Sequence, residues 1–234
     1  MRKQLKLRLM SLRLIHLFAF FFFQNLVAFA QDRQTVNYGS FSAAFGDGQT
    51  SFAVDVSHSW KLGKSKKFEL GVGVRITAFF GSQKYYTSAP SNLASNSANT
   101  DSIYLQSPQT TSFNLTLNFG YQFTPKLGLG FNIDAIGSSF GPTQTGTYIG
   151  PSGGLVRATP TSFNLLLINN NDMGNLNSEF SVRYFITEQF AIKLLYQHLF
   201  TEYTTYSEVQ LQPEPNNRFR YKGNLFGIGA CLRF

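Results

Sequence analysis

Apolar and polar residues alternate one by one over long stretches of this chain, most regularly in the segment SFNLTLNFGYQF at residues 112–123. A period of two is that of a β-strand, whose successive side chains point to opposite faces. Stretches of this kind lie at about 34–46, 50–62, 67–80, 110–123, 126–140, 175–187, 189–204 and 221–234. The pattern therefore predicts an all-β fold of eight strands, with a bulge near Gly39 where the alternation is blurred.

The connections between these stretches are of two kinds. Four are short, and the other three are long, polar and rich in Ser, Asn and Thr, at about 81–109, 141–174 and 205–217. In an up-and-down antiparallel arrangement the three long connections all fall at the same end of the sheet. Loops on a rigid scaffold commonly carry binding, so these three are the candidate contact regions; a hydrated surface without a ligand is the alternative.

The last stretch, YKGNLFGIGACLRF, carries a further signal. Its even-numbered positions from Phe226 to Phe234 are all apolar, and Leu232 lies two residues before the terminal Phe234. This ending resembles the assembly signal of bacterial outer-membrane β-barrels, and the whole pattern resembles the small, porin-like OmpA-like and OmpX-like type. The resemblance implies a closed transmembrane barrel in the outer membrane of a Gram-negative bacterium, with membrane lipid and the barrel-assembly machinery as partners.

One segment fits this division poorly. The sequence TSFNLLLI at 161–168 has the character of a strand and echoes TSFNL at 111–115. Counted as a membrane-spanning strand, it would make nine strands and place Phe234 on the outer side. We therefore expect it in the external extension, with a ten-stranded barrel that takes one more strand from 81–109 as the alternative.

The first thirty residues have the three parts of a secretory signal peptide. Five cations precede an apolar run, which closes with Ala28-Phe29-Ala30. The domain division is accordingly 1–30 signal peptide and 31–234 barrel. Without the five leader cations, 15 of the 20 Lys and Arg remain against 12 Asp and Glu, so the basic pI gives no ground for a nucleic-acid partner.

Composition favours a barrel over other membrane structures. The chain is 16% aromatic and only 14% charged, yet no apolar run after residue 30 reaches the roughly 20 residues that a spanning helix needs. A closed barrel also pairs every backbone group between strands. The soluble alternative is a lipocalin-like barrel, whose apolar face would point inward. The single cysteine, Cys231, allows no disulfide within the chain.

The positions expected to face the inside of the barrel carry equal numbers of acidic and basic side chains. They are four acids, Asp55, Glu69, Asp134 and Glu179, and four bases, Arg75, Arg183, Lys193 and Arg233. An eight-stranded barrel is just wide enough for side chains to fill, and a charge inside it is costly unless it is paired. We expect a lumen closed by an ion-pair network, with a narrow passive channel for small solutes as the alternative.

Ser178 and His198 are the only catalytic candidates that the pattern offers. Both have outward parity on neighbouring strands, and they lie opposite each other if the turn at 187–189 closes symmetrically. Some outer-membrane barrels are lipid-A-modifying enzymes with Ser and His in that region. A third, orienting group is missing, because Glu202 lies four residues along the strand, about 13 Å from His198. We therefore expect no enzyme, with a lipid-modifying enzyme as the alternative, and no cofactor or metal site.

The assembly role of the final strand gives a first prediction. Phe234→Ala should lower the amount of folded barrel in the outer membrane, because it removes the terminal aromatic of the predicted signal. The measurement is the heat-modifiable band in outer-membrane fractions, and Phe226→Ala, on the same face of the same strand, is the control. Unchanged insertion of Phe234→Ala would contradict the role.

Overall fold

The computed structural model describes residues 35–167 and 171–234. The predicted signal peptide at 1–30 lies outside the described residues. Thirteen strands form one sheet, and all its pairings are antiparallel between strands that run up and down. Among the residues that the structure describes, no helix has the length and apolar character needed to cross a membrane.

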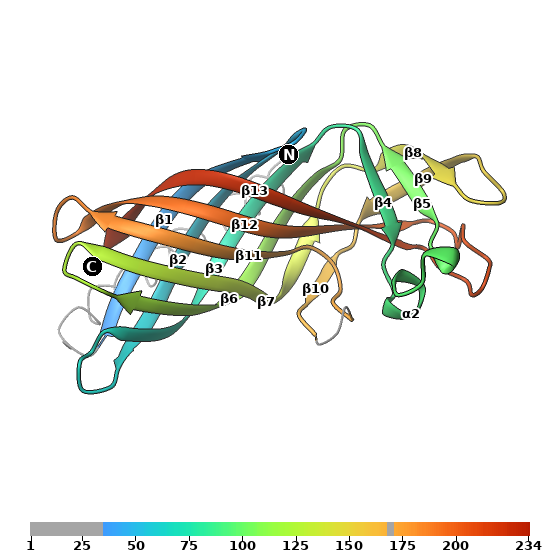
Figure 1. Cartoon of the computed structure of the whole chain (residues 1–234). Coiled ribbons are helices and arrows are strands. Elements are labelled where there is room, and N and C mark those ends of the chain that lie inside the picture. The colour runs from blue at the N-terminus through green and yellow to red at the C-terminus, as the bar shows by residue number, and fades with distance from the viewer. Residues whose placement is uncertain (1–34, 168–170) are drawn as a thin grey trace, which may run out of the picture.

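Eight long strands pair in a closed ring, here called the first ring, and Figure 1 shows them side by side. They are β1 (Thr35–Gly46), β2 (Gln49–Leu62), β3 (Phe68–Gly81), β6 (Gln109–Gln122), β7 (Leu127–Phe140), β11 (Leu176–Phe185), β12 (Phe190–Thr205) and β13 (Arg218–Arg233). Each pairs with the next in this order, and β13 pairs with β1. Each predicted stretch coincides with one of these strands, and the largest difference is at β13, which begins at Arg218 instead of Tyr221.

The two faces of the first ring have opposite chemistry. On β3, Phe68, Leu70 and Ile76 are exposed on the exterior, whereas Glu69 and Arg75 are buried in the lumen. The same division holds on β2, β6 and β13, because side chains alternate along each strand. An apolar face that pointed inward, as in a lipocalin-like barrel, is therefore excluded for this ring.

A bulge lies on β7 and not near Gly39, where the sequence predicted one. Strand β1 keeps a continuous register with both neighbours through Gly39. The register shifts instead where β6 meets β7: Leu115 pairs with Ile136 and Thr116 with Asp134, so Ala135 is the extra residue. The bulge reverses the parity of β7 beyond this point, which lets Asp134 and Ser139 both face the lumen.

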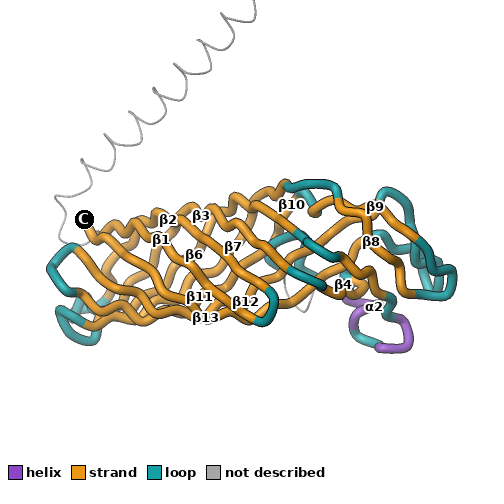
Figure 2. The backbone as a smooth tube through the Cα atoms, turned by 90° about the horizontal axis from the view of Figure 1, so that it is seen from above, coloured by secondary structure: helices purple, strands orange, loops and turns teal. Residues whose placement is uncertain are grey.

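β12 and β13 also belong to a second ring of six strands, whose short strands lie beyond one end of the first ring in Figures 1 and 2. The other members are β4 (Lys84–Ser88), β5 (Ser102–Leu105), β8 (Gln144–Ile149) and β9 (Leu155–Pro160). Pairing runs from β13 through β4, β5, β8 and β9 to β12, which pairs back with β13. The long polar connections therefore contain most of a second small barrel, which the sequence did not predict.

The second ring has an apolar core of its own. Tyr86, Ile103, Leu105, Tyr148, Val156, Ala158, Tyr203 and Phe219 pack together there, and all are buried. The hydroxyl of Tyr148 also donates to Asp101, and burial together with this carboxylate raises the pKa of Tyr148 above its ordinary value. Because these side chains are buried together, parts of the polar connections at 81–109 and 141–174 form strands packed around a core.

The segment at 161–168 forms only a short strand. β10 (Phe163–Leu165) pairs with residues 136–138 of β7, next to the part of β7 that pairs with β11. It thus lies at the end of the first ring that carries the second ring, as expected for an arm of the extension; Ile168 itself lies outside the described residues. The remaining elements, α2 (Ser91–Ala94) and η2 (Ser97–Asn99), follow β4.

Candidate functional site

The centre of the lumen holds an ion pair between Arg75 on β3 and Asp134 on β7. Arg75 Nε lies 2.9 Å and Nη2 2.5 Å from Asp134 Oδ1, and both side chains are almost fully buried. The second carboxylate oxygen accepts from Asn114 Nδ2 at 2.7 Å and from the Asn177 backbone at 2.9 Å. Both oxygens of the acid are thereby satisfied, which a buried carboxylate requires.

Lys193 on β12 forms a second centre. Its ammonium lies 3.0 Å from Glu179 Oε1 and 3.7 Å from Asp55 Oδ2. It also donates to Ser40 Oγ at 2.7 Å, and Ser40 in turn donates to Asp55. Gln197 Nε2 donates to the other oxygen of Glu179 at 3.1 Å, so one cation is shared by two acids within a connected network.

A third centre lies nearer the end of the barrel where the chain ends. Arg183 Nη2 is 3.3 Å from Glu69 Oε2, and the Tyr38 hydroxyl donates to Glu69 Oε1 at 2.8 Å. The guanidinium lies 4.3 Å from the centroid of the Tyr38 ring. Three residues from three strands are thus held together by an ion pair, a hydrogen bond and a cation–π contact.

The structure brings together seven of the eight charges that the sequence placed in the lumen. Arg233 is the exception, because its Nε and Nη2 donate to the backbone oxygen of Glu188 at 2.9 and 2.5 Å. It therefore lies at the rim of the first ring. Beside it, Leu232 and Phe234 of the predicted assembly signal are exposed on the exterior, and the Phe234 backbone pairs with that of Asn37 on β1.

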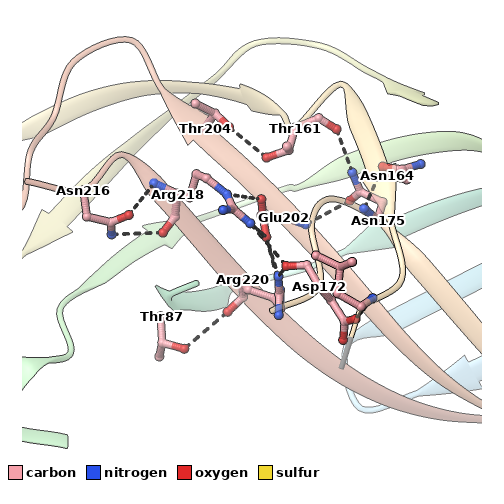
Figure 3. A network of polar contacts seen from close by, with 11 residues as sticks. Thr87, Thr161, Asn164, Asp172, Asn175, Glu202, Thr204, Asn216, Arg218 and Arg220 are labelled. Carbon is pink, nitrogen blue, oxygen red and sulfur yellow. Dashed lines mark hydrogen bonds and ion pairs between the residues drawn. The ribbon is translucent and has the colours of Figure 1, made fainter. Parts of the chain in front are cut away.

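A second polar network, between the two rings, was missed by the sequence analysis (Figure 3). Glu202 on β12 is fully buried and accepts from Arg218 Nε and Arg220 Nη2 on β13, both at 2.8 Å. Both arginines also donate to the backbone oxygen of Asp172. Glu202 follows Thr201 and precedes Tyr203, and all three are buried. Alternation within a single ring cannot predict this, since the strand is enclosed by two rings at this point.

Polar and charged side chains of the first ring line a small cavity. The cavity among Tyr38, Asp55, Glu179 and Lys193 measures about 40 Å³, enough for only one or a few water molecules. Within the described part of the chain, no group of three or more His, Cys, Asp or Glu side chains is arranged to hold a metal ion. The lumen of the first ring thus holds its charges in fixed pairs around this cavity.

A different polar group lies on the exterior face. Ser178 on β11 is directly opposite His198 on β12, as the sequence predicted, and both side chains are half-buried. No hydrogen bond joins these two side chains, both of which the structure describes. His198 Nδ1 instead lies 2.7 Å from Oδ1 of Asn224, which is directly opposite it on β13. Asn224 could not be found from the sequence, because its contact with His198 depends on the register between β12 and β13.

Comparisons with known proteins give structural likeness only. No protein-family model and no curated protein matches the chain. Among similar solved structures, the Yersinia pestis outer membrane protein Ail in a phospholipid bilayer nanodisc is 8% identical, with 86% of this chain and 98% of that chain covered and a TM-score of 0.37. Neisserial surface protein A is 11% identical (86% and 96% covered, TM-score 0.35), and a major outer membrane protein from Thermus thermophilus is 12% identical (85% and 99%, TM-score 0.36).

The central ion pair gives a prediction about stability. Arg75→Ala should lower the free energy of unfolding by about 3–5 kcal/mol, because Asp134 is then left buried without its partner. The measurement is urea unfolding in detergent, followed by loss of the heat-modifiable band. Arg233→Ala, at the rim, is the control and should cost at most about 1 kcal/mol. Equal losses in the two variants would contradict the network.

Proposed function

We propose that this chain is an integral β-barrel of the bacterial outer membrane, exported by residues 1–30. The eight strands of the first ring span the bilayer, and the side chains of the lumen close it. The second ring stands outside the cell and presents its surface to the surroundings. Membrane lipid and the barrel-assembly machinery, through Leu232 and Phe234, are its partners.

The observation that carries this proposal is the exposed apolar belt of the first ring. Side chains such as Val54, Ile76, Leu115, Leu194 and Ile228 are all about half exposed in the middle of their strands. Soluble proteins rarely expose a continuous apolar surface of this extent. A bilayer removes the cost, because its hydrocarbon replaces water around these side chains, and the closed ring leaves no backbone edge unpaired.

The strand lengths support the count of eight spanning strands. The members of the first ring are 10 to 16 residues long, and about 9–11 tilted residues cross a bilayer. The strands that belong only to the second ring have four to six residues, and β10 has three. A ten-stranded spanning barrel would need two further long strands, and the described residues contain none.

Closure of the lumen supports a structural rather than a transport role. Three ion-pair centres lie across the first ring, and the buried pairs of Glu202 lie at its outer end. Opening a path would require separating buried charges, which is costly. The second ring then adds a packed apolar core at the outer end of the barrel.

Membrane placement predicts different costs for two equivalent substitutions. Leu194→Arg, at a first-ring position that is 59% exposed, should destabilise the protein in lipid by about 2–4 kcal/mol. Leu155→Arg, at a second-ring position that is 79% exposed, should change stability little because it meets water. Unfolding in lipid vesicles measures both. Equal, small effects would indicate that the belt of the first ring does not face lipid.

Closure of the lumen predicts that the wild-type protein gives no stepwise conductance in planar bilayers. Insertion is verified in the same preparation by flotation with vesicles and by heat-modifiable migration. Discrete, reproducible conductance steps from inserted protein would contradict the closed lumen and favour a narrow channel instead.

A further inference from the structure

Ser178, His198 and Asn224 form a row across three neighbouring strands of the exterior face. Ser178 pairs with His198 between β11 and β12, and His198 pairs with Asn224 between β12 and β13. Side chains in directly opposite positions have Cβ atoms about 4.5–5.5 Å apart. The imidazole therefore lies between a hydroxyl on one side and an amide on the other.

The side-chain oxygen of Asn224 contacts the imidazole of His198. This oxygen, Oδ1, accepts from the Tyr196 hydroxyl at 2.8 Å and lies 2.7 Å from His198 Nδ1. A carbonyl oxygen can only accept, so this contact requires a hydrogen on Nδ1, and in the neutral imidazole the lone pair then lies on Nε2. Ser178 lies on the other side of His198 from Asn224, one strand away. The tautomer with the hydrogen on Nδ1 is the one that a general base next to a serine requires.

We propose that this row is a hydrolytic site for acyl esters of lipids in the outer leaflet. Ser178 is the nucleophile, His198 is the general base, and Asn224 is the positioning residue that holds the imidazole. The row supplies the orienting group that Glu202 could not supply. This inference rests on the membrane placement proposed above.

The height of the row matches the ester region of a lipid. Eight residues separate Phe190 from His198 on β12, about 26 Å along the strand at about 3.3 Å per residue. At a tilt of about 40° this is about 20 Å along the barrel axis, close to the upper edge of an apolar band about 25 Å tall. Below the row, Phe180, Leu194 and Phe226 are exposed for acyl chains.

Lys222 indicates the charge of the substrate. It lies on the same face of β13, two residues beyond Asn224, away from the apolar belt. Its ammonium is 5.3 Å from the centroid of Phe200, the outward neighbour of His198 on β12. A cation directly above an ester-hydrolysing row fits a lipid with an acidic, phosphate-bearing headgroup.

The reaction needs only water as co-reactant. The Ser178 oxygen bonds to the ester carbonyl carbon while Nε2 takes the hydroxyl proton. The bond from that carbon to the lipid alcohol breaks, and the alcohol leaves with the proton. Water then attacks the acyl-serine through the same base, which releases the fatty acid and restores the serine. In the resting structure the Ser–His contact is not closed, as is common before a substrate binds.

The chain contains an internal comparison for this row. His58 on β2 also has Nδ1 2.7 Å from an asparagine Oδ1, that of Asn37 on β1. The residue opposite His58 on its other side, however, is Val72 on β3. A His–Asn pair can therefore occur on the exterior face without a serine beside it. The His198 row differs from the His58 pair because Ser178 lies opposite His198.

The test uses the full, folded barrel in detergent–lipid mixed micelles and in vesicles. A fluorophosphonate probe should label the wild type at Ser178, and fatty acid should be released from phospholipid or from lipopolysaccharide, the two sources measured in separate arms. Ser178→Ala should abolish labelling and release. His198→Gln should reduce kcat by about 10²–10⁴-fold, whereas His58→Gln and Ser138→Ala, an exposed serine on β7, should leave both unchanged.

Asn224 is tested through its positioning role. Asn224→Leu should lower kcat and shift the pH profile of hydrolysis, and Asn224→Asp should restore most of the rate because a carboxylate also accepts from Nδ1. Heat-modifiable migration verifies folding of every variant. A folded, vesicle-bound wild type that neither reacts with the probe nor releases fatty acid from either lipid overturns the site alone. Failure to float with vesicles, with Ser178 still labelled, overturns the membrane placement instead.

Discussion

Pairing of β13 with β1 is the interaction on which the rest of this structure depends. Eight register pairs, from Phe45 with Phe226 to Tyr38 with Arg233, join the two ends of the described chain. Without them β1 and β13 would both be open edges, whose unpaired backbone groups cannot be satisfied in hydrocarbon. Closure also creates an interior, so it is the condition for every buried ion pair described above.

The alternation of side chains along each strand gives the lumen and the exterior face of the first ring opposite chemistry. Inside, the ring is narrow, and seven charges are brought into three centres, by partners on neighbouring strands as for Lys193 and Glu179 or across the lumen as for Arg183 and Glu69. On the exterior face of β11, β12 and β13, the apolar belt ends where polar side chains replace apolar ones. Ser178, His198 and Asn224 lie at that level, where lipid esters and side-chain chemistry can meet.

Much of the first ring was predictable because its pattern is local. Alternation located all eight strands, parity placed Asp134 and Lys193 inside, and symmetric closure of the turn at 187–189 placed Ser178 opposite His198. The second ring was not predictable, because the strands that belong to it alone are four to six residues long and their burial depends on neighbours far away in sequence. For the same reason, Glu202 and Asn224 escaped notice: the first is enclosed by two rings, and the second is paired across a strand whose register the sequence does not give.

The shared hairpin of β12 and β13 has a consequence for the order of folding. Phe219 on β13 pairs with Ser88 on β4, from which it is separated by more than half of the chain. The same strand closes the first ring with β1. Neither ring can therefore be completed before the last strand is available, and contacts of such long sequence separation form slowly. Both barrels therefore depend on the final hairpin of β12 and β13, which belongs to each of them.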